Sequence, residues 1–252
     1  MEVRKLLYAT DLRQPSFSEV EGLLSLLGLK EVIFLHTTKV EDWDGRFADY
    51  GLTLKTFMVA GHLVPAILNV ARQGAVSLIA ASLNRDKRRP LRGSPTTELL
   101  RASTLPVLIL PEDAQASGSM EKDIFTHLIF ATDWSPASEK ALRYLLSLDL
   151  KTITKALEIV HVIDKKLSVK GMRDLKERLA QTRKILKEQG IDAESHVYAG
   201  KPIEEIMLAA KNYEATCIVM GTTGKSALKD LLSHRCSYGV AEASVVPTLV
   251  VP

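Results

Sequence analysis

The chain has 252 residues, of which 46% are hydrophobic and 25% are charged, and its formal net charge is +3. This composition is typical of a globular protein with one large or two ordinary domains, and the balanced charge makes a nucleic-acid partner unexpected. No apolar stretch reaches the roughly 20 residues of a membrane-spanning helix. The charged start also lacks the apolar segment of a secretory signal, so we expect a cytoplasmic protein with no membrane partner.

Strand and helix patterns alternate from the start of the chain. Short, nearly continuous apolar runs predict strands at 3–10, 31–38, 76–82 and 106–111. Amphipathic stretches between these runs predict helices at 16–27 and 62–73. Strands without polar alternation are typical of a parallel sheet covered on both faces, and the alternation with helices indicates βαβ units.

The same pattern occurs a second time. Residues 5–26, KLLYATDLRQPSFSEVEGLLSL, align without a gap with residues 127–148, HLIFATDWSPASEKALRYLLSL. Further along, residues 61–82 align with residues 200–221, and each half closes on a similar apolar strand that ends in proline. A repeat of this length indicates two copies of one fold.

The second half contains one helix that the first half lacks. Helices are predicted at 138–148, 169–189 and 202–213. The middle one is long and rich in Lys, Arg and Glu, whereas its counterpart in the first half is reduced to residues 41–52, where we expect a loop.

A linker separates the two repeats. Residues 112–123, EDAQASGSMEKD, are small, polar and acidic, which is typical of a flexible connection. We therefore predict a first domain at 1–111, a linker at 112–123 and a second domain at 124–252.

Three features of the second domain resemble the universal stress protein family. Residues 131–133 read Ala-Thr-Asp with Ser135 two positions on, residues 218–224 read IVMGTTG, and the chain closes on a Pro-x-Leu-Val-Val strand. The resemblance covers nearly all of the second domain and, less strongly, the first domain. The chain as a whole therefore resembles a tandem, two-domain member of this family.

This resemblance implies that both domains are α/β and Rossmann-like, of the adenine nucleotide alpha hydrolase-like type. Each would have a five-stranded parallel sheet of order 3-2-1-4-5 with helices on both faces. The family also implies dimers formed by pairing of the last strands. In this chain, strands 106–110 and 247–251 would instead pair within an intramolecular pseudo-dimer, and a homodimer of the whole chain stays open.

Some members of the family bind ATP through the phosphate signature Gly-x2-Gly-x9-Gly-Ser/Thr. Glycines there let the backbone approach the phosphates. The second domain keeps the first two glycines but has His-Arg in place of Gly-Ser. Together with two residues at the ends of the first two strands, they form the candidate nucleotide site for ATP with Mg²⁺. Its residues are Asp133, Val162, Gly221, Gly224, His234 and Arg235.

The first domain shows the opposite loss. Ser82 and Arg85 stand in place of the two early glycines, but Gly-Ser is kept before a predicted helix start at Pro95. The basic stretch before it indicates a secondary anion site, and a solvated basic loop is the alternative. The residues of this site are Arg88, Arg89, Gly93 and Ser94.

Two residue types at strand ends have alternative interpretations. Asp133 either meets the base or ribose of a nucleotide or caps the following helix, which starts with Ser135 and Pro136. His36 and His161 recur at the end of the second strand of each domain. Without nearby cysteines or spaced carboxylates, they indicate a structural role in the repeat and no metal site.

Two functions follow from these residues. The first is a stress-response protein whose second domain holds ATP or a related nucleotide as a regulatory ligand. The second is a tandem module that binds no nucleotide and serves a structural or partner-binding role. No catalytic constellation occurs, so we do not predict an enzyme; slow ATP hydrolysis is a third alternative for which no general base can be named.

Overall fold

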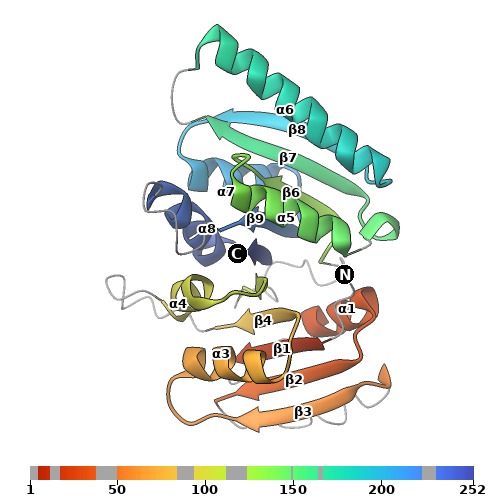
Figure 1. The fold of residues 1–252 in the computed structure, drawn as a ribbon, viewed down its shortest axis with the longest axis vertical. Coiled ribbons are helices and arrows are strands. Elements are labelled where there is room, and N and C mark those ends of the chain that lie inside the picture. Colours follow the sequence, from red (N-terminus) through yellow and green to blue (C-terminus); the bar gives the residue numbers. More distant parts are fainter. Residues whose placement is uncertain are drawn as a thin grey trace. The chain divides into compact units, whose positions relative to one another are not determined.

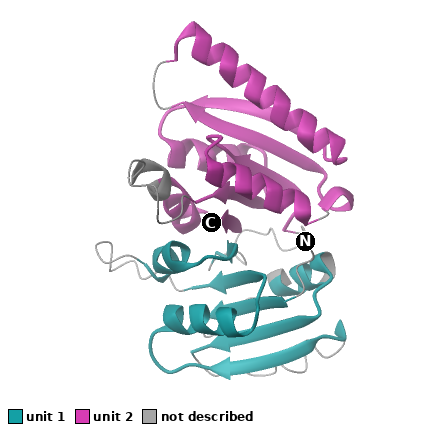
Figure 2. Ribbon diagram, in the orientation of Figure 1, with its two compact units in different colours: residues 1–121, 252 teal, residues 122–251 magenta. Residues whose placement is uncertain are grey.

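The computed structural model describes residues 5–11, 18–37, 50–83, 94–111, 124–148, 150–163, 167–222 and 231–252 (Figure 1). Of residues 18, 19, 25, 26 and 231–235 it describes the backbone alone. The chain divides into two compact units, residues 1–121 with Pro252 and residues 122–251 (Figure 2). The predicted linker at 112–123 lies outside the described residues.

The first unit is built on a five-stranded parallel sheet. Its described elements are β1 (Lys5–Thr10), α1 (Ser18–Leu27), β2 (Glu31–His36), β3 (Thr53–Met58), α3 (Leu63–Gln73), β4 (Leu78–Ser82), α4 (Pro95–Ala102) and β5 (Val107–Ile109). The strand order is β3-β2-β1-β4-β5, and every neighbouring pair is parallel.

The second unit repeats this arrangement. Its described elements are β6 (His127–Ala131), α5 (Pro136–Ser147), the 3-10 helix η4 (Leu150–Thr152), β7 (Ala156–Ile163), α6 (Val169–Glu188), β8 (Ala193–Ala199), α7 (Pro202–Asn212), β9 (Cys217–Gly221), α8 (Leu231–Ala243) and β10 (Thr248–Val251). The order β8-β7-β6-β9-β10 is again parallel throughout. Both sheets therefore confirm the predicted order 3-2-1-4-5.

Helices cover both faces of the second sheet. The chain turns back at the central strand β6, so right-handed crossovers place α5 and α6 on one face and α7 and α8 on the other. In agreement with this, α7 packs on α8, on β6 and on β7, whereas α5 packs on β9 and β10. The central strands are buried on both sides, which is why they read as continuous apolar runs.

The helices of the second unit follow from their local sequence. Ser135 caps α5 by accepting a hydrogen bond from the Ser138 N–H, and Pro136 occupies the first turn, where its missing N–H costs nothing. In α6 the buried positions recur at helical spacing and form one apolar stripe on an otherwise charged helix. They are Leu175, Leu179, Thr182 and Leu186.

The five helices with predicted bounds lie within two residues of the observed ones at either end. Helix α5, predicted from residue 138, begins at Pro136 because Ser135 supplies the cap. Most of the expected loop at 41–52 lies outside the described residues. Strands β3 and β8 were not identified by apolar pattern, since both lie at sheet edges and carry exposed polar residues.

Candidate functional site

Asp133 lies at the carboxyl end of the central strand β6, where open parallel sheets bind ligands. Its Oδ1 accepts hydrogen bonds from the Ser135 N–H, at 2.9 Å, and from the Ser138 hydroxyl. The carboxylate therefore supports the first turn of α5, beside the cap that Ser135 provides. No described residue hydrogen-bonds to the other carboxylate oxygen, Oδ2, and the residue is exposed.

The environment keeps Asp133 ionised. Burial of the carboxyl group acts to raise its pKa, but hydrogen bonds from Ser135 and Ser138 act against burial and lower the pKa below the ordinary value of 3.8. A carboxylate that is stabilised in this way is a hydrogen-bond acceptor and a weak base.

Trp134 occupies the turn between β6 and α5 with an unusual backbone, at a φ of 55°. Its indole ring lies 4.7 Å from the ring of His161, and its Nε1–H donates to Thr182 Oγ1 on α6 at 3.2 Å. His161 Nδ1 is in turn 2.8 Å from the carbonyl oxygen of Thr132. This agrees with the structural role predicted for His161, and it places an aromatic surface beside Asp133.

The end of β7 extends past the end of β6. The last residue of β6, Ala131, is paired with Val160, and the Thr132 N–H donates to the Val160 carbonyl. Successive strand residues alternate in direction, so the N–H and C=O of Val162 also point toward the β6 side. No described residue forms a backbone hydrogen bond to Val162 on that side, which leaves a backbone donor and acceptor at the carboxyl edge.

Gly221, the last residue of β9, is required by packing. A Cβ atom at this position would overlap the carbonyl group of Ala137 and would lie 2.6 Å from the Ser138 N. The glycine therefore lets the first turn of α5 lie directly on β9. This reason is independent of any phosphate, which was the reason expected from the sequence.

The remaining predicted residues of the second unit are only partly described. Gly224 lies outside the described residues, and His234 and Arg235 belong to α8, with their backbone alone described. The next residue, Cys236, lies near Asp133: burial and the negative charge of Asp133 together raise the pKa of its thiol to about 11. The start of α8 is thus brought to the same edge as Asp133.

The first unit has a cavity of about 270 Å³ at the corresponding carboxyl edge. Asp11 at the end of β1, Thr37 after β2 and the first turns of α3 and α4 contribute to its walls. Ser94, from the predicted anion site, caps α4 by accepting from the Thr97 N–H at 3.1 Å. Of the predicted anion site, Arg88, Arg89 and Gly93 lie outside the described residues, so the structure describes Ser94 alone.

One polar cluster was missed by the sequence reasoning. Glu158 is buried in the middle of β7 and contacts His127 and His196 from the two neighbouring strands. The signal was present, since a lone carboxylate inside the apolar run ALEIVHVI must be paired when it is buried. This cluster lies apart from the carboxyl edge, at the start of β6.

Within the described residues, no helix combines the length and the apolar character needed to cross a lipid bilayer.

A parallel sheet of order 3-2-1-4-5 with polar groups at its carboxyl edge defines an open, Rossmann-like α/β protein. Residues 125–252, just over half of the chain, match the model of the universal stress protein family. The chain therefore belongs to the universal stress protein family.

Individual relatives agree with this assignment. Universal stress protein MJ0577 of Methanocaldococcus jannaschii is 27% identical over an alignment that covers 51% of this chain and 95% of the relative. Universal stress protein YxiE of Bacillus subtilis is 33% identical, over 34% of this chain and 54% of the relative.

Solved structures match the whole chain. A universal stress protein from Archaeoglobus fulgidus is 22% identical, with a TM-score of 0.75, and the match covers 99% of this chain and 96% of that one. Protein PA1789 of Pseudomonas aeruginosa, of unknown function, is 17% identical, with a TM-score of 0.68 and coverage of 99% and 92%. At these identities the similarity concerns the fold.

Proposed function

We propose that this chain is a tandem stress-response protein whose second unit binds ATP or a related nucleotide as a regulatory ligand. The first unit is then a degenerate copy, since Ser82 and Arg85 replace the two early glycines of the phosphate signature. One observation carries the proposal: Asp133 Oδ2 and the backbone of Val162 are both at the carboxyl edge of neighbouring strands, without hydrogen-bond partners there among the described residues.

These two groups suit the base and ribose of a nucleotide. A purine edge has neighbouring hydrogen-bond donors and acceptors, which can pair with the N–H and C=O that Val162 presents beyond the end of β6. The ionised carboxylate of Asp133 can accept from a ribose hydroxyl, and hydrogen bonds to a charged acceptor are stronger than neutral ones. The base and ribose end of the site therefore fits a nucleotide.

The proposed contacts with the phosphates of the nucleotide are argued from the sequence alone. Gly224 is the signature glycine whose backbone would approach the phosphates, and Arg235 offers a guanidinium that can pair with a phosphate oxygen. Since His234 and Arg235 replace Gly-Ser, a small hydroxyl donor is lost and bulk is added. We expect weaker affinity than in relatives with a complete signature, with any Mg²⁺ carried by the phosphates.

A regulatory role is favoured over catalysis. The hydrogen bonds that lower the pKa of Asp133 make it a weak general base. We therefore propose that bound nucleotide is held and released intact.

Tryptophan fluorescence tests this proposal directly. The chain has two tryptophans, so Trp43→Phe leaves Trp134, the neighbour of Asp133, as the single reporter. Titration of this variant with ATP, ADP and AMP is expected to change the emission in a saturable way. Gly224→Val should abolish the change by blocking the backbone, whereas Gly93→Val, in the first unit, should leave it intact.

The outcomes separate the alternatives. Loss only from Gly93→Val would place the site in the first unit, and equal loss from both glycine variants would contradict a site confined to the second unit. No response to any of the three nucleotides, together with no heat in calorimetry, would support the partner-binding module instead. Release of inorganic phosphate during the ATP titration would contradict a purely regulatory role.

A further inference from the structure

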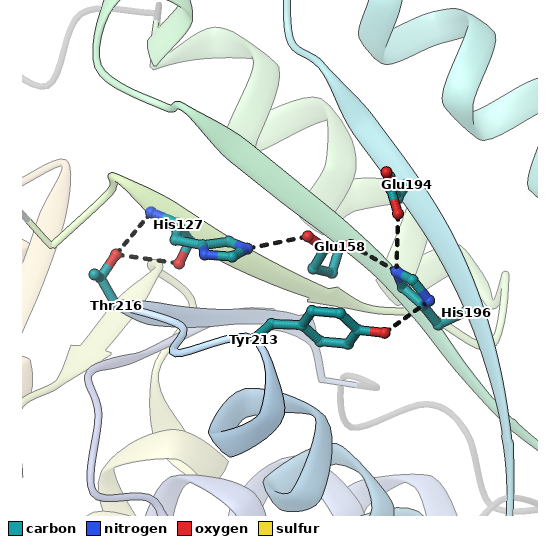
Figure 3. A network of polar contacts seen from close by, with 6 residues as sticks. All are labelled: His127, Glu158, Glu194, His196, Tyr213 and Thr216. Carbon is teal, nitrogen blue, oxygen red and sulfur yellow. Dashed lines mark hydrogen bonds and ion pairs between the residues drawn. The ribbon is translucent and has the colours of Figure 1, made fainter.

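A buried carboxylate on β7 lies between histidines of the two neighbouring strands (Figure 3). Glu158 Oε1 is 3.0 Å from His127 Nε2, and Glu158 Oε2 is 2.6 Å from His196 Nε2. Glu194 is paired with Glu158 across the strands, and its Oε2 is 4.0 Å from His196 Nε2. Tyr213, which follows α7, places its hydroxyl 2.9 Å from His196 Nδ1. Five titratable groups thus meet on one face of the sheet.

The first unit contains a related cluster without histidine. Glu31 on β2 lies between Lys5 on β1, at 3.1 Å, and Lys55 on β3, at 2.8 Å. Cationic side chains on the first and third strands therefore suffice to hold a carboxylate of the second strand in this fold. Histidine in the second unit is not needed for that purpose, and it brings a property that protonated lysine lacks, which is the ability to bind a metal ion.

From this geometry we propose that Glu158, Glu194 and His196 bind a divalent transition-metal ion of the Zn²⁺ class. Two carboxylates and one imidazole are ligands that Zn²⁺ accepts in proteins, and the remaining position would be filled by water. Mg²⁺ and Ca²⁺ are disfavoured, because they prefer a larger set of oxygen ligands without imidazole.

Small movements bring the three ligand atoms to coordinating positions. One ligand atom of each residue already lies within 4.8 Å of the other two. In tetrahedral geometry, bonds of about 2.0–2.1 Å place the ligand atoms roughly 3.3 Å apart. Glu158 Oε2 and His196 Nε2, now at 2.6 Å, must separate by roughly 0.7 Å to reach that distance, and Glu194, whose side chain is 75% exposed, must close in. The exposed carboxylate is thus the mobile ligand and the buried one the fixed ligand.

The groups behind the ligands have the arrangement of an outer coordination shell. His127 holds the second oxygen of Glu158, and Tyr213 contacts the second nitrogen of His196. With Nδ1 protonated and donating to the Tyr213 oxygen, Nε2 is left as the ligand atom.

A metal ion at this site replaces a proton. The 2.6 Å contact between His196 Nε2 and Glu158 Oε2 holds one hydrogen. When both atoms bind the metal ion, this proton moves to Nδ1 of the same ring, where it can be donated to the Tyr213 oxygen, or leaves to solvent if Nδ1 already carries one; no electron transfer is involved.

Calorimetry with ZnCl₂ tests the proposal, on the full chain without an affinity tag, stripped of metal and free of nucleotide. We expect saturable binding of one ion. Co²⁺ should bind competitively and show visible absorption without thiolate charge-transfer bands. Glu194→Gln should weaken binding at least about tenfold, and Tyr213→Phe by about 10–100-fold, the range for loss of an outer-shell partner.

Two further variants complete the design. His196→Lys should abolish binding while keeping a cation beside Glu158, as Lys55 does beside Glu31; circular dichroism and thermal melting check that it folds. Glu188→Gln removes an exposed carboxylate from α6 and should leave affinity unchanged. The proposal is overturned if the unmodified protein shows no saturable zinc binding, or if either Glu194→Gln or His196→Lys binds zinc as tightly as the unmodified protein. Because nucleotide is absent, neither result depends on the proposed nucleotide site.

Discussion

The backbone of Gly221 at the end of β9 lies directly against the backbone of Ala137 in the first turn of α5, with no room between them for a Cβ atom. This contact brings the strand end and the Asp133 turn together in the second unit. A glycine that the family pattern associates with phosphate thus has a packing reason of its own.

Gly221→Ala is therefore expected to destabilise the protein without any ligand present. The added methyl group would overlap the Ala137 carbonyl, and overpacking of this kind costs about 1–3 kcal/mol. Gly171→Ala is the matched control, because a Cβ there meets nothing closer than 3.4 Å and alanine favours the helix by up to about 1 kcal/mol. Urea unfolding should move the two variants in opposite directions; equal stability of Gly221→Ala and the unmodified protein would contradict the packing argument.

Replacement of Tyr144 on α5 by phenylalanine is expected to stabilise the folded protein. Its hydroxyl is buried without a hydrogen-bond partner among the described residues, and burial raises its pKa. Tyr144→Phe should raise the free energy of unfolding by about 1 kcal/mol, since an unsatisfied polar group is removed. Tyr213→Phe, which removes a hydroxyl bonded to His196, should instead lower it by about 0.5–1.5 kcal/mol. Thermal melting of both variants measures the contrast, and destabilisation by Tyr144→Phe would show that this hydroxyl has a partner.

The Asp133 carboxylate should contribute pH-dependent stability. Its folded pKa lies below the ordinary 3.8, so the contribution is present above that pH and is lost as pH falls through the folded pKa. At pH 7, Asp133→Asn should cost no more than about 1 kcal/mol, because the amide oxygen still accepts the same hydrogen bonds and solvent screens the charge. Urea midpoints of the two proteins should converge below pH 3.8. A constant difference over this range would mean that the charge is not involved.

Both cysteines should be unreactive in the folded protein. Burial raises the pKa of Cys217 to about 12, and burial with the charge of Asp133 raises that of Cys236 to about 11. At pH 8 only about one Cys236 side chain in a thousand is then a thiolate, the reactive form. Iodoacetamide labelling followed by mass spectrometry should show slow modification in buffer and rapid modification of both residues in urea. Asp133→Asn should accelerate labelling of Cys236 alone. Equal labelling rates in the variant and the unmodified protein would show that the charge of Asp133 does not affect this thiol.

The sequence was sufficient for the repeat and for the strands with apolar runs, and insufficient for β3 and β8. Apolar runs such as VSLIAAS predict strands because both of their faces are covered, but β3 and β8 are edge strands with exposed polar residues and look like loops. The parallel order 3-2-1-4-5 followed from the family resemblance, since apolar periodicity carries no information on which strands are neighbours.

The sequence predicted where the candidate site lies better than it predicted which contacts form the site. Asp133 could be placed at a strand end from the Ala-Thr-Asp repeat, but its hydrogen bonds with Ser135 and Ser138 depend on the path of the turn. Gly221 and its contact with Ala137 join segments far apart in sequence. The Glu158 cluster required knowledge of which strands flank β7, which a single sequence does not contain.

A single indole N–H joins the carboxyl edge of the sheet in the second unit to the longest helix of that unit. Trp134 follows Asp133 directly and bonds to Thr182, which belongs to the buried stripe of α6. The aligned residue of the first unit is Leu12, whose side chain has no hydrogen-bonding group. A ligand that displaced Trp134 would act through this hydrogen bond on α6, a helix of 20 residues whose outer surface is densely charged. Binding at the end of one strand would then change the position of charged side chains on the outer surface of the helix.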